Sequence, residues 1–238
     1  MKFSFPIGSV FGLLLFLTGV LLDIAISAGV LWGELEARSN TSSSVNSGLS
    51  MACPHLLAFH ETGVVRASVT NTLDQDSQPM VTAQISQSNG TQQTSETLRL
   101  APHESKIVQW KVDASNILYG RLILVSVLQG KYQDLPARQG SCGILFLNLF
   151  GMNGREMIVL LCLASFALLV VGAVTWMRAH LPLNSRDENI ARAFGSLGGL
   201  ATMGLVAALL RWWGLIIILD AVALILIVVI FTELLFNP

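Results

Sequence analysis

Four long stretches that are almost free of charge constrain the fold of this chain more than any other feature. They cover residues 3 to 33, 157 to 177, 193 to 210 and 214 to 236. Roughly 20 consecutive apolar residues allow a helix to cross the ~30 Å hydrocarbon core of a membrane. Only 12% of the 238 residues are charged, against about 25% in a soluble domain. We therefore predict a membrane protein with four transmembrane helices.

The apolar stretches and the polar residues between them set the predicted boundaries. Membrane helices are expected at residues 1–33, 155–178, 186–211 and 213–236, with a cytoplasmic loop at residues 179–185. The first stretch is much longer than the roughly 7–15-residue core of a signal peptide. We therefore expect the first helix to be an uncleaved anchor.

Positive charges near the helix ends predict the orientation, because cytoplasmic loops carry an excess of Lys and Arg. One side of the membrane would hold Lys2, Arg178, Arg186 and Arg192, and the other side Arg38, Arg155 and Arg211. This small excess places both termini in the cytoplasm and residues 34–154 outside.

The region between the first two apolar stretches changes from a helical to a strand-like pattern. Residues 34–52 are rich in Ser and Asn, which predicts a flexible stalk. From Cys53 onward apolar and polar residues alternate, as Val65, Ala67 and Val69 do in VVRASVTNTL. Seven short strands are expected between residues 53 and 150, at residues 55–59, 64–73, 81–86, 98–100, 107–112, 121–129 and 142–150. This number and spacing of strands are typical of a β-sandwich.

The stretches ASVTNTLDQDSQPMVTAQI and LRLAPHESKIVQWKV resemble bacterial Ig-like domains of the CARDB type. In that family a strand ending in V-T-N-T precedes a polar turn, and a later L-x-P-G-E-S turn leads into a strand with alternating Val and Trp. His103 stands here where the family usually has Gly. The resemblance covers residues 55 to 130 and implies an extracytoplasmic, non-catalytic binding or spacing module. The predicted fold class is an α+β membrane protein with an Ig-like seven-stranded β-sandwich inserted between helices 1 and 2.

Two of the three cysteines, Cys53 and Cys142, bracket the predicted β domain. We expect a disulfide between them, which would stabilise the domain by about 4–5 kcal/mol in the chain-entropy model and require an oxidising compartment. Parallel pairing of the first and last strands, as in Ig-like sandwiches, would bring the two residues together. The alternative is two unpaired thiols. Cys162 lies within the second span and is interpreted as a small apolar residue.

Two acidic residues, Asp23 and Asp220, interrupt the first and fourth spans. At a rise of 1.5 Å per residue, both would lie roughly 10–14 Å below the outer interface, and Arg211 at the end of the third span is within reach of that depth. A lone carboxylate at the bilayer centre costs at least ~2.5 kcal/mol, so each should be paired, protonated or buried in protein. We interpret both as contacts between helices or with a partner subunit. A proton or cation relay is the alternative.

Small residues predict where helices approach one another. Gly8 with Gly12 and Gly195 with Gly199 form GxxxG patterns, and Gly204 continues the second stripe. Such spacing allows close approach of two helix backbones. Packing within this chain and association with another chain both remain open.

Motifs for catalysis and for cofactors are missing from the sequence. It contains no C-x-x-C, Walker loop, H-E-x-x-H or G-x-S-x-G. We therefore predict no enzyme activity, no cofactor and no metal, and the net charge of −1 gives no indication of nucleic-acid binding.

These observations favour a non-catalytic accessory or scaffold subunit of a larger bacterial plasma-membrane complex, for example a respiratory or photosynthetic electron-transfer assembly. Its partners would be other membrane subunits, lipid and an extracytoplasmic component covered by the β domain. One alternative is a free-standing cell-surface adhesion or envelope-binding protein. Another is a small ion-coupled transporter that uses Asp23 and Asp220.

Overall fold

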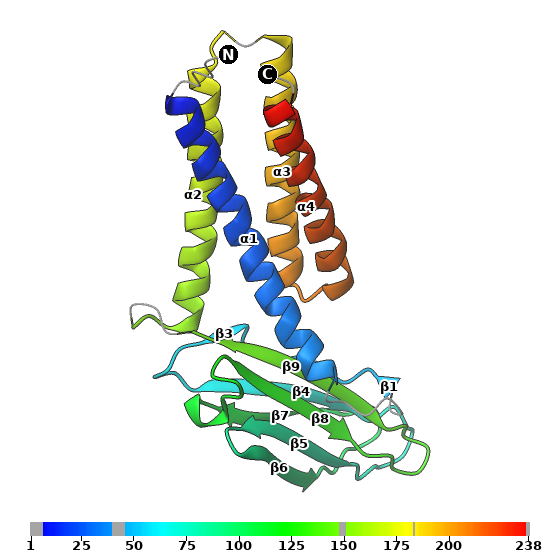
Figure 1. The fold of residues 1–238 in the computed structure, drawn as a ribbon. Coiled ribbons are helices and arrows are strands. Elements are labelled where there is room, and N and C mark those ends of the chain that lie inside the picture. The colour runs from blue at the N-terminus through cyan, green and yellow to red at the C-terminus, as the bar shows by residue number, and fades with distance from the viewer. Residues whose placement is uncertain (1–6, 40–45, 148–150, 183, 237–238) are drawn as a thin grey trace. The chain divides into compact units, whose positions relative to one another are not determined.

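The computed structural model of the chain describes residues 7–39, 46–147, 151–182 and 184–236. The helix α1 (Ile7–Ser39) comes first, nine strands follow, and α2 (Gly154–Ala179), α3 (Ser185–Leu209) and α4 (Trp213–Phe236) come last (Figure 1). The chain divides into two compact units. The helical unit comprises residues Met1–Leu31 and Ile158–Pro238, and the β unit comprises residues Trp32–Met157.

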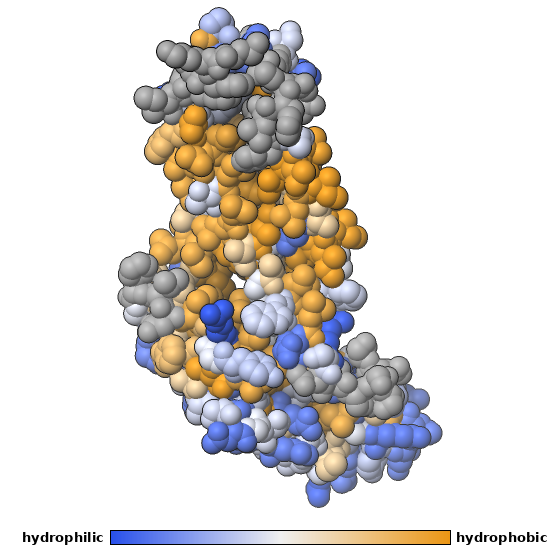
Figure 2. All heavy atoms as spheres, viewed as in Figure 1, coloured by the Kyte–Doolittle hydropathy of each residue, from blue (hydrophilic) through white to orange (hydrophobic). Residues whose placement is uncertain are grey.

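All four helices are long and apolar enough to span a membrane. Figure 2 shows apolar side chains over the visible surface of the helical unit, as expected for helices that face hydrocarbon. The bounds of α2, α3 and α4 lie within two residues of the predicted spans. The first six residues of the predicted first helix lie outside the described residues.

Aromatic side chains form much of the core of the helical unit. Phe16 of α1 stacks on Phe194 of α3 with ring centroids 4.7 Å apart. Trp176 of α2 meets the same Phe194 ring edge-on at 5.0 Å. All three side chains are buried, so this cluster packs α1, α2 and α3 together.

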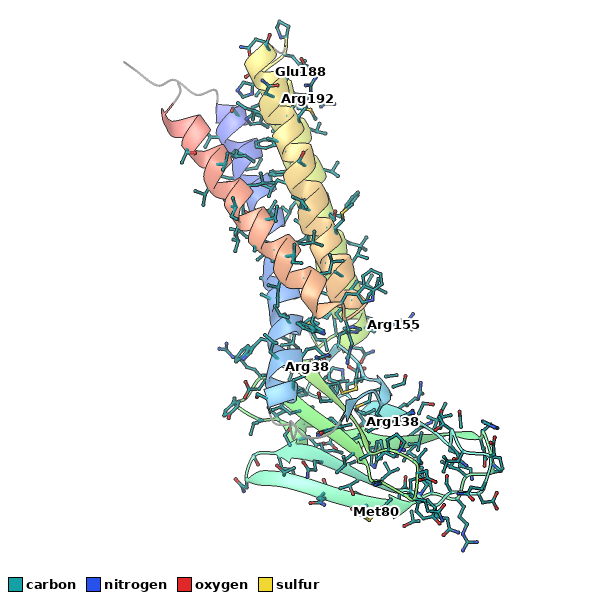
Figure 3. The ribbon with its side chains drawn as sticks, turned by 90° about the vertical axis from the view of Figure 1, so that its right-hand side faces the viewer. Arg38, Met80, Arg138, Arg155, Glu188 and Arg192 are labelled. Carbon is teal, nitrogen blue, oxygen red and sulfur yellow. A yellow bond between two sulfur atoms is a disulfide. The ribbon has the colours of Figure 1, made fainter. Side chains whose placement is uncertain are left out.

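The ends of α3 follow from local chemistry. Before α3, the Asn184 side chain accepts a hydrogen bond from the Asp187 N–H at 2.9 Å, which satisfies a free N–H group of the first turn. One turn further, Glu188 and Arg192 form an exposed ion pair at 2.6 Å (Figure 3). After α3, Arg211 adopts a left-handed conformation with φ of 58°, and α4 starts two residues later. The helices α3 and α4 are therefore joined by a short turn.

The nine strands of the β unit form two sheets. Their bounds are β1 Asn46–Ser47, β2 Ser50–Ala52, β3 Leu56–Leu57, β4 Gly63–Thr70, β5 Met80–Gln87, β6 Gly90–Thr97, β7 Ser105–Val112, β8 Leu122–Gln129 and β9 Arg138–Phe146. One sheet has six strands in the order β1-β9-β8-β5-β6, with β3 also paired to β9. The other has three strands in the order β2-β4-β7.

The predicted fold class, with a seven-stranded Ig-like sandwich inserted between helices 1 and 2, is wrong. The β region that precedes α2, α3 and α4 has nine described strands, and its larger sheet is mixed because β1 and β3 pair in parallel with β9. The expected strand at residues 98–100 is not formed, since Leu100 makes only an isolated bridge to Ser77. The strand that precedes it, β6, was missed because its residues are all exposed and polar, which leaves no apolar alternation.

The core of the β unit lies where inward-facing side chains of both sheets meet. Alternate residues of β4, β5 and β8 are almost fully buried, for example Val65, Val81 and Val127, each with an exposed fraction of 0%. They belong to one continuous apolar cluster. This alternation is the period-two pattern that the sequence shows.

The predicted flexible stalk at residues 34–52 is also wrong over its described part. Residues 34–39 continue α1, because Leu35, Glu36 and Ala37 favour helix, and residues 46–47 and 50–52 form β1 and β2. Residues 40–45 lie outside the described part of the chain. Ala37 packs against Leu122 of β8, so the last turns of α1 belong to the β unit.

Candidate functional site

Asp23 of α1 is buried in the helical unit with an exposed fraction of 1%. The hydroxyl of Ser165 on α2 donates to Asp23 Oδ1 at 2.6 Å, and Ser165 is itself fully buried. This hydrogen bond joins α1 to α2. Among the described residues, no hydrogen bond is made to Asp23 Oδ2.

Asp220 of α4 is held in a similar way by a serine of another helix. The hydroxyl of Ser27 on α1 donates to Asp220 Oδ2 at 2.7 Å. On the other side, a Cβ atom at Gly204 of α3 would lie only 2.8 Å from Asp220 Oδ1. Glycine at position 204 therefore leaves room for the carboxylate where α1, α3 and α4 meet.

The structure brings the two predicted acidic residues together. Asp220 accepts a hydrogen bond from Ser27, one turn after Asp23 on α1, although nearly 200 residues separate the two carboxylates in the sequence. Arg211, which we expected to lie within reach of that depth, lies in the turn between α3 and α4. The hydrogen bonds described for the two carboxylates come from Ser27 and Ser165. A serine in an apolar span is a weak signal, so neither Ser27 nor Ser165 was predicted as a partner of these carboxylates.

The first predicted glycine pair, Gly8 and Gly12, lies where α1 packs against α2. A Cβ atom at Gly12 would lie 2.5 Å from the Trp176 backbone nitrogen and 2.9 Å from the Gly172 carbonyl oxygen, and one at Gly8 would lie 3.7 Å from Ala179 Cβ. The two backbones therefore touch at Gly12, as the GxxxG pattern predicts. Gly172, the matching glycine of α2, was missed because it stands in no such pattern.

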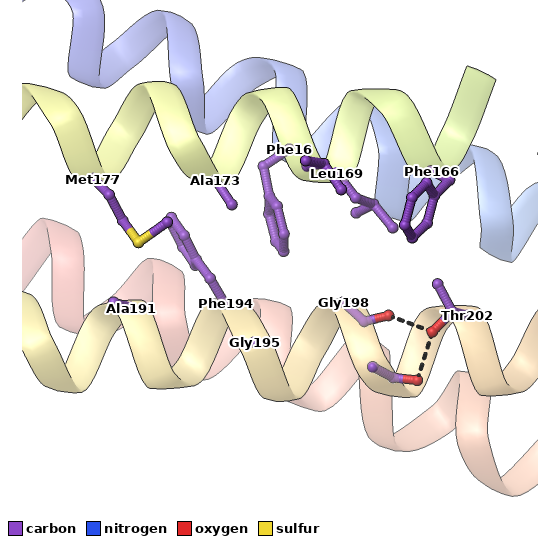
Figure 4. A pocket seen from close by; sticks show the side chains of 12 residues that line it. Phe16, Phe166, Leu169, Ala173, Met177, Ala191, Phe194, Gly195, Gly198 and Thr202 are labelled. Carbon is purple, nitrogen blue, oxygen red and sulfur yellow. Dashed lines mark hydrogen bonds between the residues drawn. The ribbon is translucent and has the colours of Figure 1, made fainter. Parts of the chain in front are cut away.

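The second predicted pair, Gly195 and Gly199, makes no packing contact within the described chain. A Cβ atom at either position would meet no atom within 4 Å. Both glycines instead line an open groove beside α3 (Figure 4). Of the two interpretations that the sequence left open, packing against another helix of this chain is not seen for Gly195 and Gly199 among the described residues.

The groove has a volume of about 320 Å³ and an apolar lining. It is lined by Phe16, Phe166, Leu169, Val170, Ala173, Met177, Ala191, Phe194, Gly195, Gly198, Gly199 and Thr202. The only hydroxyl, that of Thr202, donates to the carbonyl oxygens of Gly198 and Gly199 at 3.0 Å each (Figure 4). The groove thus offers apolar surface and a glycine-lined backbone, without a free polar side chain.

The β unit carries the expected disulfide. Cys53 and Cys142 are joined with their Cα atoms 6.6 Å apart. Leu56 of β3 pairs in parallel with Leu145 of β9, so an early strand runs beside the last one, as expected. The bond closes a sequence separation of 89 residues.

Polar side chains of the β unit mostly serve its own structure. Glu61 accepts a hydrogen bond from the Gly154 N–H at 2.8 Å, which caps the first turn of α2. A hydrogen bond from Ser115 holds the pKa of Asp113 below its ordinary value. A hydrogen bond from the Ala101 N–H does the same for the pKa of Glu104. Within the described ranges no three His, Cys, Asp or Glu side chains gather in a way that could hold a metal ion.

These features define a class of protein: four helices suited to a membrane and a two-sheet β unit. No family model and no curated protein matches the chain. Solved structures with a similar region include a cycloisomaltooligosaccharide glucanotransferase of Paenibacillus sp. (15% identity, 44% of this chain and 14% of that chain, TM-score 0.36). A transglutaminase of red sea bream is also similar (13% identity, 48% and 18%, TM-score 0.36).

A CARDB domain from Pyrococcus furiosus is another weak structural neighbour. It is 8% identical, and the match covers 44% of this chain and 95% of that domain with a TM-score of 0.31. The matched region spans under a fifth of the two enzymes, 14% and 18% of their chains.

Proposed function

We propose that this chain is a non-catalytic accessory or scaffold subunit of a larger plasma-membrane complex. The open groove along Gly195, Gly198 and Gly199 carries the proposal. Helices in a membrane associate where small residues allow their backbones to approach closely. Apart from the adjoining backbone of α3, no described atom of this chain lies within 4 Å of a Cβ built at Gly195 or Gly199. The proposed occupant is a transmembrane helix of a partner subunit.

The contacts of the two acidic residues in the spans, Asp23 and Asp220, support a structural role for the helices. Ser165 links Asp23 to α2, and Ser27 links Asp220 to α1. Hydrogen bonds between helices stabilise a bundle inside the membrane. In this proposal they hold the helices in the arrangement that leaves the groove open to the partner.

The proposed location is the bacterial plasma membrane, with both termini in the cytoplasm and the β unit outside. The disulfide between Cys53 and Cys142 supports this orientation, because disulfides persist in oxidising compartments. The β unit would dock on or cover an extracytoplasmic component of the complex. A respiratory or photosynthetic electron-transfer assembly is one such complex.

We also propose that the β unit is a divergent relative of CARDB-type modules. The proposal rests on the V-T-N-T strand end and on the turn before β7, APHES, in the sequence. His103 in that turn adopts a φ of 57°. Glycine adopts this left-handed conformation freely, so the backbone there agrees with the glycine that is usual in the family.

Filling the groove tests the accessory role. The tagged full chain and its Gly199→Leu variant are extracted from native membranes in mild detergent, and copurifying proteins are quantified by mass spectrometry. Leucine favours helix over glycine by about 0.8–1 kcal/mol, so the variant should fold. We expect wild type to recover a membrane partner in fixed stoichiometry and Gly199→Leu to lose it.

The matched control is Gly214→Leu. Gly214 also has no atom within 4 Å of a built Cβ, but it lies on α4, outside the residues that line the groove. This variant should keep the partner. Equal recovery from Gly199→Leu and wild type, or recovery of lipid alone with wild type, would contradict the proposal.

A small ion-coupled transporter is the second candidate, and one observation favours it. Asp220 accepts a hydrogen bond from Ser27, one turn after Asp23 on α1, and among the described residues Asp23 Oδ2 accepts no hydrogen bond. A paired variant, Asp23→Asn with Asp220→Asn, separates the two functions. Loss of ion flux in proteoliposomes with the partner retained would favour transport, whereas loss of the partner without a flux change would favour the accessory role.

A further inference from the structure

Strand β6 is an open edge of the six-stranded sheet, and all eight of its residues are exposed. An exposed edge presents unpaired N–H and C=O groups, which natural proteins usually protect with Lys, Pro or a bulge. The sequence of β6, GTQQTSET, contains no Lys, Arg or Pro. It pairs with β5 residue for residue, from Met80 opposite Thr97 to Gln87 opposite Gly90. The edge is therefore long, regular and unprotected.

The hydrogen bonds of β5 determine which groups of β6 point outward. Residues of an antiparallel pair alternate between bonding to each other and bonding away from each other. The Gly130 N–H donates to the Met80 carbonyl at 2.8 Å, and the Leu98 N–H donates to the Pro79 carbonyl at 3.1 Å. The backbone N–H and C=O groups of even-numbered β5 residues therefore point to β8, and those of odd-numbered β5 residues point to β6.

The same alternation continues across β6. The partners of the odd-numbered β5 residues are Gly90, Gln92, Thr94 and Glu96, so the backbone groups of these four point to β5. The remaining residues direct their N–H and C=O groups away from the sheet: Thr91, Gln93, Ser95 and Thr97.

We propose that β6 pairs in antiparallel fashion with β6 of a second copy of this chain, about a two-fold axis at Thr94. In this register Thr91 bonds to Thr97 of the second copy, and Gln93 bonds to its Ser95. Each outward-facing group of the strand then has a partner. The two Thr94 residues face each other as a pair without backbone hydrogen bonds.

Charge and register both favour this axis. Glu96 is the only charged residue of β6, and it lies opposite Gln92 of the second copy, whose amide can donate to the carboxylate. Two like charges, which would destabilise the sheet, therefore do not lie opposite each other in this register. Moving the axis to Gln93 would pair Thr97 with Asn89 in the hairpin loop, and moving it to Ser95 would pair Thr91 with Arg99 beyond the strand.

The isologous arrangement explains why a second copy is the proposed occupant. A two-fold interface uses the same surface on both chains, so every contact occurs twice. The outward-facing residues are placed symmetrically about Thr94, which is what such an interface requires. The inference is independent of the partner helix proposed for the groove, since it involves only the β unit.

Cysteine cross-linking of the full chain in detergent tests the register. Residues opposite each other without backbone hydrogen bonds have Cα atoms about 4.5 Å apart, within the distance that a disulfide spans. In a Cys162→Ala background, Thr94→Cys should therefore form a covalent dimer under mild oxidation. Gln93→Cys is the matched control, because the two copies of position 93 would be offset by two residues, roughly 8 Å apart, and should cross-link at least about tenfold less.

Removing one outward-facing N–H tests the pairing itself. Gln93→Pro deletes a group that bonds to the second copy but not to β5. Light scattering should give a dimer for wild type and a monomer for Gln93→Pro, with the Cys53–Cys142 disulfide and the circular dichroism spectrum retained. A monomeric wild type, stronger cross-linking of Gln93→Cys than of Thr94→Cys, or a different protein strand paired to β6 would overturn the proposal.

Discussion

At the scale of single residues, the serine hydroxyls that bind Asp23 and Asp220 carry the polar contacts between helices. Ser165→Ala removes the 2.6 Å hydrogen bond to Asp23 and leaves this buried carboxylate with one partner fewer. Side-chain hydrogen bonds between membrane helices contribute about 0.6–1.7 kcal/mol, and we expect a loss of that size in the free energy of unfolding in mixed micelles.

Ser196→Ala is the control for this measurement. The Ser196 hydroxyl donates only to the Arg192 carbonyl of its own helix and is exposed. Its removal should change the free energy of unfolding by much less. Equal effects of the two alanine substitutions would mean that the contact to Asp23 does not hold α1 and α2 together.

The contribution of Asp113, a carboxylate of the β unit, to the stability of the fold should depend on pH. The hydrogen bond from Ser115 lowers the pKa of Asp113 in the folded chain, so its stabilising contribution is fully present above the unfolded pKa of about 3.9. That contribution is lost as the pH falls through the folded pKa.

Denaturation of wild type and Asp113→Ala at neutral and at acidic pH checks this prediction. The difference in stability between the two proteins should shrink on acidification below about pH 3.9. Asp76→Ala, at another exposed loop carboxylate, serves as the control. A difference between wild type and Asp113→Ala that does not change with pH would contradict the role given to Ser115.

At the scale of elements, substitutions at two glycines distinguish the closely packed helices α1 and α2 from the open groove beside α3. A Cβ at Gly172 of α2 would meet the Phe16 backbone of α1 and lie 2.8 Å from the Gly12 carbonyl oxygen, whereas one at Gly195 of α3 would meet nothing within 4 Å. Gly172→Ala should lower the melting temperature of the purified chain. Gly195→Ala should leave it unchanged or raise it, because alanine favours helix by about 1 kcal/mol over glycine.

The helices could be predicted from the sequence far better than the strands. Hydrophobic length alone locates a membrane span, and α2, α3 and α4 end within two residues of their predicted bounds. The strands β1 and β3 have two residues each, too few to show a period. The polar strand β6 carries no apolar face, so its existence depends on its pairing with β5 rather than on burial.

The acidic residues of the candidate site could be predicted from the sequence, but the residues that donate hydrogen bonds to them could not. An acidic residue in an apolar span stands out, and both Asp23 and Asp220 lie where helices meet. Their partners Ser27 and Ser165 come from other helices, and a single sequence does not show which helices are neighbours. For the same reason, the pattern could not distinguish Gly12, which touches α2, from Gly199, which contacts no other helix among the described residues.

At the scale of the whole molecule, the two units would have different tasks in the proposed complex. The helical unit presents the glycine-lined groove, and the β unit presents the edge of β6. In the two proposals, a helix partner and a second copy would use different surfaces of this chain, which share no residue.

The central claim is that the groove receives a helix of another protein. A photoreactive p-benzoylphenylalanine at position 195, irradiated in native membranes, tests it most directly, since Gly195 lines the groove and has free space around it. The account predicts one dominant cross-link to a membrane-spanning segment of a partner protein, absent when the probe is placed at position 214. Cross-links to lipid alone, or equal yields from both positions, would contradict it.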